Sequence, residues 1–581
     1  MKKIYGFAAL CAAMTLASCS NENEPNVTPS GSKMETQTAY IAVSLATPAT
    51  DTRAITYENG DASLYESDAK SAVFAYFDGN GEFIGVTDEI PLDGWKPYTG
   101  SESIEKYTST LVKVEQPTSQ VVDKKIKYIM AVVNCPADVK SYLDAEYAKE
   151  SGRDNMVTMR KKVGAYTATT VGEDASKKGA FVMTNSAYGT GDAVTYLTEC
   201  SDNVYNNPGD AQNNPSAIIY VERVLARVDA KFPEDEVLTN TAEPEVGNIT
   251  TDGYSSAIQK ISIKITGFEV ANMATQSHLV KDLSNNGSYP LNDWYTAGEH
   301  RSHWATMPTT MTWSNQSYNK IAVENFSAKG TKNPLYIQEN VDANNVSSIL
   351  ITAQLCDEQG NELKDLYRLT GNGKYYTENA AKVAAQGYLQ ADGYRISKEA
   401  GKYESVPVED IVFVDNKNKG WDGHVEITLG AGEKLYQVVG TTYSEMNVAE
   451  VNAAFKAGSI ASINNALSSE IGEDGKPVVT DTYRYGVRKW ATGKCYYYKN
   501  IAGVNGADGN PLAGIVRNHI YRLNLNSVAG LGIPVFDPTE DIIPNDPPKI
   551  DPKDDWYLNA KINILQWGVY TQDVNFETPN E

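Results

Sequence analysis

The sequence predicts a mainly β protein, and three observations support this. Its 581 residues include 36 Tyr and 44 Gly, together with many Val, Ile and Thr; aromatic and β-branched residues favour strands, and Gly favours turns. Apolar residues recur at alternate positions in many short segments. Two apolar runs also flank Asp78-Gly79-Asn80-Gly81, which is typical of a hairpin. A chain of this length is expected to form two or three domains.

The N-terminal residues indicate export. Lys2 and Lys3 precede a short apolar run that ends in Leu16-Ala17-Ser18-Cys19, as in a cleavable signal peptide, and the run is too short to span a bilayer. Residues 16–19 resemble a bacterial lipobox, in which a peptidase cuts before the Cys and the thiol carries lipid. We therefore predict a signal peptide over residues 1–18 and a lipid anchor at Cys19. The alternative is an ordinary secretory signal with a coincidental Cys.

The first predicted strand follows a polar tether. In residues 39–47, Ile41, Val43 and Leu45 alternate with more polar or smaller residues, which predicts one amphipathic strand. A polar stretch with Pro48 and Arg53 comes next. Exposed polar loops are preferred sites of proteolysis, so a protease that cuts in this loop would separate the strand from the rest of the chain.

Strands and turns continue to a predicted domain boundary near residue 233. Residues 125–136 indicate a buried strand that ends at Pro136, and residues 216–233 indicate strand structure that ends at Pro233. A stretch rich in acids, Thr and Asn follows to about residue 255, and such composition is typical of a linker. The strand pattern then restarts near residue 257.

Helical spacing appears mainly at residues 446–468. One face carries Val448, Val451 and Phe455, and a second face carries Ile460, Ile463 and Leu467, with Gly458 between them. Asn447 followed by Glu450 is a plausible helix start. We expect these helices to form an insertion in the second domain.

The C-terminal end combines a stiff linker with one more strand. Residues 537–555 contain five prolines and seven acidic residues, so this segment is expected to be extended and semi-rigid. Beyond it, Leu558, Ala560, Ile562 and Ile564 alternate with polar residues, and the apolar phase then shifts to Leu565, Trp567 and Val569. The shift indicates either a bulge or a buried strand that is apolar on both faces.

Two amphipathic strands therefore stand apart from the rest of the chain, one before a cleavable loop and one beyond a long linker. A strand with an apolar face must find an acceptor sheet, in its own chain or in a neighbour. The sequence pattern alone leaves both arrangements open.

Several stretches together resemble the fimbrillins of type V pili, the Mfa- and FimA-like subunits of Gram-negative anaerobes. The resemblance covers nearly the whole chain, is most specific at the C-terminal end, and is looser from about residue 370 to 480. The matching features are the lipobox at Cys19, Arg53 after a short first strand, and the segments at residues 221–230, 264–281, 300–305, 495–501, 516–538 and 561–576.

The resemblance implies an assembly mechanism. In that family a surface lipoprotein is cut by a trypsin-like protease, here between Arg53 and Ala54, and the first strand leaves with the lipid. A neighbouring subunit then fills the vacated groove with its C-terminal strand. That donor would be residues 556–576 here, and we expect Ile562, Ile564, Trp567 and Val569 to anchor it, without an assignment of their faces.

The resemblance also implies an architecture of two transthyretin-like β-sandwich domains, with the helical insertion in the second. The expected segments are the signal peptide 1–18, a lipidated propeptide 19–53, an N-terminal domain 54–233, a C-terminal domain 234–536, a linker 537–555 and a donor strand 556–581. An anchor subunit would be expected to lack the arginine or the terminal strand, and this sequence has both. A polymerising subunit is therefore expected, first on the outer membrane as a lipoprotein and then in an extracellular fimbrium.

Metal and cofactor sites are not predicted. Asp78, Asn80 and Glu82 imitate the start of a calcium loop, but no bidentate acid follows at the required spacing. His300 and His303 could share a zinc ion if they lay on a helix, whereas their surroundings contain a turn-like Gly and many aromatic residues. The sequence also contains no G-x-S-x-G, H-E-x-x-H or phosphate-loop motif, so we do not expect an enzyme.

Charge and cysteine content limit the partners. The formal net charge of −23 disfavours nucleic acid and anionic lipid surfaces. The resemblance implies as partners copies of this chain, related subunits, the trypsin-like protease and an unidentified surface ligand. Four scattered cysteines beyond the lipobox do not form a disulfide framework, although one bridge is compatible with export; they are Cys135, Cys200, Cys356 and Cys495. The alternative functions are a pilus tip adhesin or a glycan-binding surface lipoprotein.

Overall fold

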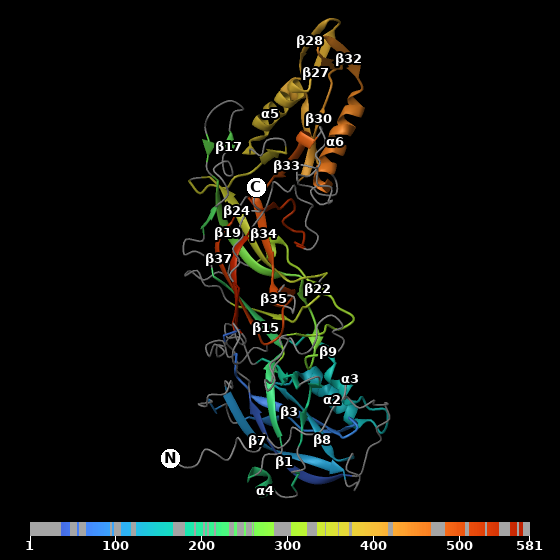
Figure 1. The fold of residues 1–581 in the computed structure, drawn as a ribbon, viewed down its shortest axis with the longest axis vertical. Coiled ribbons are helices and arrows are strands. Elements are labelled where there is room, and N and C mark those ends of the chain that lie inside the picture. The colour runs from blue at the N-terminus through green and yellow to red at the C-terminus, as the bar shows by residue number, and fades with distance from the viewer. Residues whose placement is uncertain are drawn as a thin grey trace.

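The computed structural model confirms a mainly β protein with several sandwich-like sheets (Figure 1). It describes residues 36–46, 55–56, 66–92, 96–97, 106–117, 124–166, 181–190, 193–200, 204–205, 208–213, 217–231, 237–240, 249–250, 258–259, 261–283, 302, 304–321, 334–342, 344–357, 359–370, 375–415, 422–465, 483–505, 511–528, 531–544, 558–565 and 569–572. Within these residues no helix is long and apolar enough to cross a membrane.

One sheet contains most strands of the N-terminal half. Its order is β4-β3-β8-β10-β14-β1-β7-β6, with β13 beside β8 and β5 beside β3. The bounds are β1 (Thr36–Ala46), β3 (Ser71–Asp78), β4 (Phe83–Val86), β5 (Ile90–Pro91), β6 (Lys96–Pro97), β7 (Lys106–Pro117), β8 (Ile126–Val133), β10 (Met183–Asn185), β13 (Thr198–Glu199) and β14 (Ala217–Arg223).

The central strand β3 is buried on both faces. Phe74 packs into an apolar cluster that also contains Ile129 and Ile219. Phe77 packs into a second cluster, which includes Leu143 of α2 (Ala137–Ala148) and Met159 of α3 (Met156–Arg160). The two helices therefore cover one face of this sheet, and the other face belongs to a separate core (Figure 1).

The predicted hairpin after β3 is confirmed. Strands β3 and β4 are antiparallel, and Gly81 in the turn has a φ of 73°, a value that favours Gly. The Asp78 carboxylate accepts the backbone N–H groups of Asn80 and Glu82, each at 2.9 Å. The Lys124 ammonium lies 3.3 Å from Asp78 and 2.7 Å from Glu82, so a lysine provides the positive charge beside these two carboxylates.

Two further sheets form the second half. The larger has the order β2-β40-β39-β37-β16-β19-β24-β34-β38, with β15 and β23 beside this path, and the smaller has the order β18-β17-β26-β25-β33-β30-β29. The larger contains β2 (Ile55–Thr56), β15 (Leu225–Lys231), β16 (Val237–Asn240), β19 (Ser262–Ala271), β23 (Leu335–Gln338), β24 (Ser348–Cys356), β34 (Lys494–Asn500), β37 (Ile520–Val528), β38 (Ile533–Pro534), β39 (Leu558–Leu565) and β40 (Val569–Gln572). The smaller contains β17 (Ile249–Thr250), β18 (Ile258–Gln259), β25 (Leu366–Leu369), β26 (Tyr375–Tyr376), β29 (Ile411–Asp415), β30 (Asp422–Ile427) and β33 (Gly486–Trp490).

These two sheets share a core. Phe268 of β19 and Ile351 of β24 belong to the same buried cluster as Leu366 of β25 and Trp490 of β33. All four side chains are at most 2% exposed, so the cluster joins the sheets into one packed unit.

The chain passes from the first sheet to the second between β14 and β15. β14 pairs with β1 and β10, whereas β15 pairs with β23 and β37. Val224 alone separates the two strands. The chain therefore changes sheet at Val224. The sequence predicts the domain boundary later, near residue 233.

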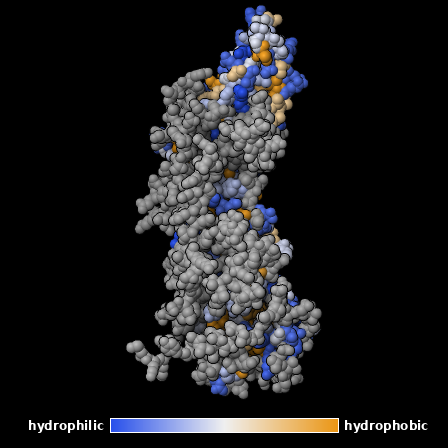
Figure 2. Space-filling view, in the orientation of Figure 1, coloured by the Kyte–Doolittle hydropathy of each residue, from blue (hydrophilic) through white to orange (hydrophobic). Residues whose placement is uncertain are grey.

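The helical insertion predicted at residues 446–468 contains α6 (Val448–Asn465). The sequence did not predict its neighbours, which are α5 (Glu378–Ala391) and a four-stranded sheet of order β28 (Lys402–Ser405), β27 (Tyr394–Glu399), β31 (Lys434–Val439), β32 (Thr442–Met446). Phe455 is buried as expected. One helix runs through Gly458, which corrects the expectation of two helical faces separated there. Figure 2 shows both hydrophobic and hydrophilic residues on the surface at the upper end of the molecule, where Figure 1 places β27, β28 and β32.

The remaining elements are short. They are β9 (Val163–Gly164), β11 (Tyr188–Thr190), β12 (Ala193–Thr195), α4 (Pro208–Asn213), β20 (Met273–Ala274), β21 (Ser277–His278), β22 (Trp313–Ser314), β35 (Ala502–Asn505), β36 (Pro511–Ala513) and the 3-10 turns Tyr318–Lys320, Val408–Asp410 and Tyr483–Tyr485.

Candidate functional site

The first strand lies inside the N-terminal sheet. β1 pairs with β7 in antiparallel orientation at all eleven of its residues, from Thr36 to Ala46. On its other side it pairs with β14 in parallel orientation, from Val43 to Ala46. We call the position between β7 and β14 the first-strand slot. An interior strand has hydrogen-bonding neighbours on both sides, so its removal would leave two unpaired strand edges.

The walls of the first-strand slot are apolar on the core side. Register sets Ile41 opposite Val112 of β7, and Leu45 opposite Ile219 of β14. Val112 and Ile219 are both 0% exposed. Residues that lie directly opposite each other share one face of a sheet, so the predicted alternation of Ile41, Val43 and Leu45 agrees with the observed register. Loss of β1 would remove the strand that covers these apolar walls.

A buried tyrosine holds the end of the β7 wall. The hydroxyl oxygen of Tyr76 accepts the backbone N–H of Glu115 at 3.2 Å. Burial raises the pKa of Tyr76 to about 12, so the phenol remains protonated at neutral pH. This contact ties β7 to the central strand β3 on which Tyr76 lies, independently of β1.

One buried ion pair ties the β14 wall to the second half of the chain, and another lies within that half. The Glu222 carboxylate on β14 accepts a hydrogen bond from the Lys281 ammonium at 2.9 Å, and both side chains are at most 2% exposed. Burial raises the pKa of Glu222 and lowers the pKa of Lys281. Arg517 and Glu339 form a second pair with both side chains 0% exposed. Breaking such a pair from one side would leave a buried, uncompensated charge.

The C-terminal segment pairs with its own chain. β39 lies antiparallel to β37 over eight register pairs, which set Ile562 opposite Leu523 and Ile564 opposite Tyr521. β40 turns back along β39 and also pairs with β2, where Val569 lies opposite Thr56. The apolar phase shift is therefore a chain reversal between two strands, which corrects both the bulge and the single strand that is apolar on both faces.

Several predicted site residues lie outside the described part of the chain. They are the lipidation site Cys19, the cleavage residues Arg53 and Ala54, and Trp567 of the expected donor segment. Arg53 falls in the connection between the end of β1 at Ala46 and the start of β2 at Ile55. The zinc alternative at His300 and His303 also falls outside the described residues.

The sequence interpretation missed β7, one of the two strands that form the first-strand slot, whereas β14 lies within residues 216–233, where strand structure is predicted. The alternation of Val112 and Val114 with charged neighbours in residues 111–115 is a detectable strand signal. The role of β7 and β14 as neighbours of β1 depends on long-range pairing, which hydrophobic alternation does not encode. None of the four described cysteines, Cys135, Cys200, Cys356 and Cys495, is in a disulfide bond.

Residues 488–573 match the family model described as major fimbrial subunit protein type IV, fimbrillin, C-terminal. This segment includes β33, β34, β37, β39 and β40, so it contains the terminal strands and the strand with which they pair. No curated protein matches the chain significantly.

Among solved structures, one described as a putative cell adhesion protein from Parabacteroides distasonis is 13% identical to this chain in sequence. The similarity covers 91% of this chain and 97% of that chain, with a TM-score of 0.32. Another of the same description from Bacteroides eggerthii is 9% identical, with coverages of 93% and 99% and a TM-score of 0.31. The C-terminally truncated tip fimbrial protein Mfa3 from Porphyromonas gingivalis is 10% identical, with coverages of 84% and 95% and a TM-score of 0.28. Similarity at this level establishes no shared activity.

Proposed function

We propose that this chain is a type V fimbrillin, a structural fimbrial subunit that polymerises by exchange of its first strand; the match of residues 488–573 to a fimbrillin C-terminal family model supports the family. The observation that carries the proposal is the position of β1 between β7 and β14. A strand in that position fills a slot that a second strand of suitable pattern can fill after the first has left.

In the proposed sequence of events, the chain reaches the outer membrane as a lipoprotein anchored at Cys19. A trypsin-like surface protease then cuts between Arg53 and Ala54. The cleaved piece contains β1 and the lipid, so after the cut β1 remains in the first-strand slot only through non-covalent pairing and can leave it. Because the released strand no longer belongs to the chain, its return becomes a bimolecular reaction that dilution disfavours.

The proposed replacement is the C-terminal segment of a neighbouring subunit, with Ile562, Ile564, Trp567 and Val569 as its anchoring residues. In its own chain, β39 has eight register pairs with β37 and only two with β40. The first-strand slot provides its present occupant with eleven pairs along β7 and four along β14. A strand that moves from its own sheet into the slot therefore finds more register pairs on each side than β39 has there, and main-chain groups at the slot are paired again.

Repetition of this contact would build an open fibre, because each subunit has one slot and one donor segment on different surfaces. The expected partners are copies of this chain and related fimbrial subunits, in an extracellular fimbrium that serves adhesion. No catalytic step is assigned to the subunit itself.

The test uses the chain from Ser20 onward, without the lipid anchor, and limiting trypsin. The new N-terminus is sequenced, and assembly is followed on gels without boiling. We expect the product to begin at Ala54 and to form a ladder of polymers. The matched controls are Arg53→Gln, which should stay intact and monomeric, and a chain that lacks residues 560–581, which should be cut and stay monomeric.

Two results would contradict this proposal. If Arg53 resists the protease while distant sites are cut, the cleavage step is wrong and a glycan-binding lipoprotein becomes the better assignment. If the full chain is cut at Arg53 but does not polymerise, a pilus tip role that terminates assembly becomes the better assignment.

A further inference from the structure

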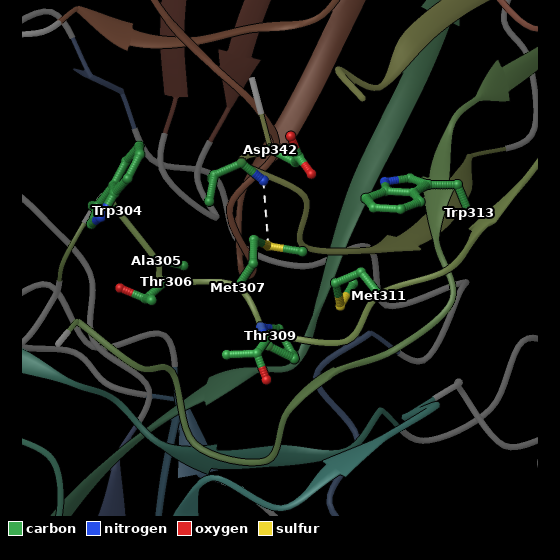
Figure 3. A pocket seen from close by; sticks show the side chains of 10 residues that line it. Trp304, Ala305, Thr306, Met307, Thr309, Met311, Trp313 and Asp342 are labelled. Carbon is green, nitrogen blue, oxygen red and sulfur yellow. Dashed lines mark hydrogen bonds between the residues drawn. The ribbon is translucent and has the colours of Figure 1, made fainter. Parts of the chain in front are cut away.

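A pocket of about 420 Å3 lies beside the loop of residues 304–313, away from the first-strand slot. Figure 3 shows the indole rings of Trp304 and Trp313 on opposite sides of this pocket, with Met307 and Met311 between them and Asp342 at its edge. Its volume is within the range of about 300 to 1,000 Å3 that is usual for small-molecule sites. Neither β1, β7 nor β14 contributes a lining residue.

Backbone hydrogen bonds hold the loop at both ends. The N–H of Thr306 donates to the carbonyl of Asp282 at 2.6 Å, and the N–H of Thr275 donates to the carbonyl of Thr312 at 3.1 Å. In addition, the N–H of Val341 donates to the sulfur of Met307 at 3.4 Å, which joins the loop to the opposite wall (Figure 3). The walls are therefore formed before any ligand arrives, which lowers the entropic cost of binding.

The position of Asp342 is also fixed. Its backbone N–H donates to the side-chain oxygen of Asn340 at 3.1 Å, and Asn340 is 0% exposed and exchanges two backbone hydrogen bonds with Ile515. The Asp342 carboxylate accepts the backbone N–H of Asn344 at 2.7 Å and the side-chain amide N–H of Asn345 at 3.3 Å. A carboxylate has more acceptor positions than this turn uses, so Asp342 retains capacity to accept hydrogen bonds from a ligand.

The lining specifies the chemistry of a ligand. Two indole rings provide broad apolar faces, while Asp342, Thr306 and Thr309 provide polar atoms at the edge. The indole N–H of Trp313 is buried and has no hydrogen-bond partner among the described residues, so it has an unmet need for an acceptor. No lysine or arginine is among the described lining residues, and an anionic ligand would face a carboxylate without compensation.

We propose that this pocket binds the pyranose ring of a neutral glycan. A pyranose has an apolar face of C–H groups, which can lie against an indole ring, and hydroxyl groups at its edge, which both donate and accept hydrogen bonds. Those hydroxyls can donate to Asp342 and accept from the Trp313 N–H in the same pose. The glycan would supply the ligand for adhesion, a role that adds to the proposed polymerisation and does not depend on it.

A cationic ligand is the main competitor, because two tryptophans and a carboxylate also suit an ammonium group. An ammonium group provides only donors or C–H groups, and it would leave the buried N–H of Trp313 without an acceptor. The threonine hydroxyls at the edge likewise suit a ligand with several hydroxyls. These contacts favour the sugar.

The test measures binding to the uncleaved chain from Ser20 onward, by saturation-transfer NMR and tryptophan fluorescence. The probes are the methyl pyranosides of glucose, galactose, mannose and N-acetylglucosamine, with tetramethylammonium as the cationic probe. We expect saturable binding of at least one pyranoside. Trp313→Phe keeps a ring but lacks the N–H, and should weaken binding roughly three- to tenfold.

The second variant distinguishes the two ligand classes. Asp342→Asn keeps an oxygen that accepts the N–H of Asn344, although it loses the acceptor for the Asn345 side chain. It should weaken pyranoside binding only a few fold, whereas it would abolish binding of a cation. Tyr443→Ala, which removes a 46% exposed ring from the distant edge strand β32, is the matched control and should leave binding unchanged. Thermal unfolding verifies that each variant is folded.

Three results would overturn the proposal: no saturable binding of any pyranoside, unchanged affinity in Trp313→Phe, or tight binding of tetramethylammonium that Asp342→Asn abolishes. Because the measurement uses the uncleaved monomer, failure of strand exchange leaves it unaffected. Failure of sugar binding likewise leaves the polymerisation experiment intact.

Discussion

Removal of β1 without a replacement should open the N-terminal sheet at β7. The perturbation is cleavage of a chain that lacks residues 560–581, so that no donor segment is present, followed by removal of the released strand. The same truncated chain with Arg53→Gln is the control, since it differs only in keeping β1 attached. Both proteins lack the terminal strand, so the comparison isolates the contribution of β1.

The magnitude follows from the register. β1 has eleven register pairs with β7, and at about 0.5–1.5 kcal/mol net per hydrogen bond these pairs contribute on the order of 5–15 kcal/mol. That is comparable to the whole free energy of unfolding of a typical domain, about 5–15 kcal/mol. Exposure of the apolar walls at Val112 and Ile219 adds to the loss. The emptied slot should therefore not persist as an ordered gap.

Hydrogen exchange with mass spectrometry measures this effect locally. Protection of residues 106–117 should fall by at least roughly a thousandfold on cleavage, because each 1.4 kcal/mol corresponds to about a factor of ten. Strand β24, whose residues are all buried in the second half, should keep its protection. A synthetic peptide of residues 556–576 should restore protection at β7. Equal protection of β7 in the cleaved protein and in the Arg53→Gln control would refute the reasoning.

Three further predictions concern stability. Ile219→Ala, at a fully buried position of the slot wall, should lower the free energy of unfolding by about 2–5 kcal/mol in urea titrations; a loss under 1 kcal/mol would contradict the burial. Arg517→Ala should cost about 3–5 kcal/mol because Glu339 would remain buried and unpaired, and Arg517→Ala combined with Glu339→Ala should recover part of that loss. Burial lowers the pKa of His278 below its usual 6.5, so as pH falls the unfolded chain binds a proton at His278 before the folded chain does, and the free energy of unfolding should decrease below pH 6.5. The unfolding temperature of His278→Asn should therefore fall less between pH 7.5 and 5.5 than that of the native chain. An identical fall in the two proteins would contradict this.

Local pattern was sufficient for the first strand and for the hairpin at residues 78–81. Ile41, Val43 and Leu45 alternate at period two, and Asp78-Gly79-Asn80-Gly81 contains the residues that a tight turn requires. Both signals depend only on residues close together in the chain. The helix at Val448–Asn465 was detectable for the same reason.

Two of the described helices that the sequence did not predict, α2 and α5, bury few large apolar residues. α5 buries Ala380, Ala381 and Ala385 together with Leu389, and alanines add little to a hydrophobic pattern. α2 buries Val139 and Leu143, but also Glu146, and so its apolar stripe is short. For α2, tertiary packing rather than amphipathic spacing identifies the buried face, whereas the apolar residues of α5 gather on one side of the helix and were detectable.

Long-range pairing explains what else the sequence could not reveal. Alternation continues through residues 217–231, yet β14 and β15 belong to different sheets on either side of Val224. The terminal segment likewise shows its apolar residues but not its chain reversal between β39 and β40. The pocket between Trp304 and Trp313 was invisible because its walls come from separate parts of the chain.

The most direct test of strand exchange identifies the strand that occupies the slot in a polymer. A photoreactive benzoylphenylalanine replaces Ile562 in one copy, and an isotopically heavy copy carries the native residue. After trypsin and polymerisation, we predict cross-links from position 562 to residues 106–117 or 217–223 of the heavy copy. Within its own chain, Ile562 lies opposite Leu523 of β37. Polymers in which position 562 cross-links only to residues 520–528 of the same copy would therefore contradict strand exchange.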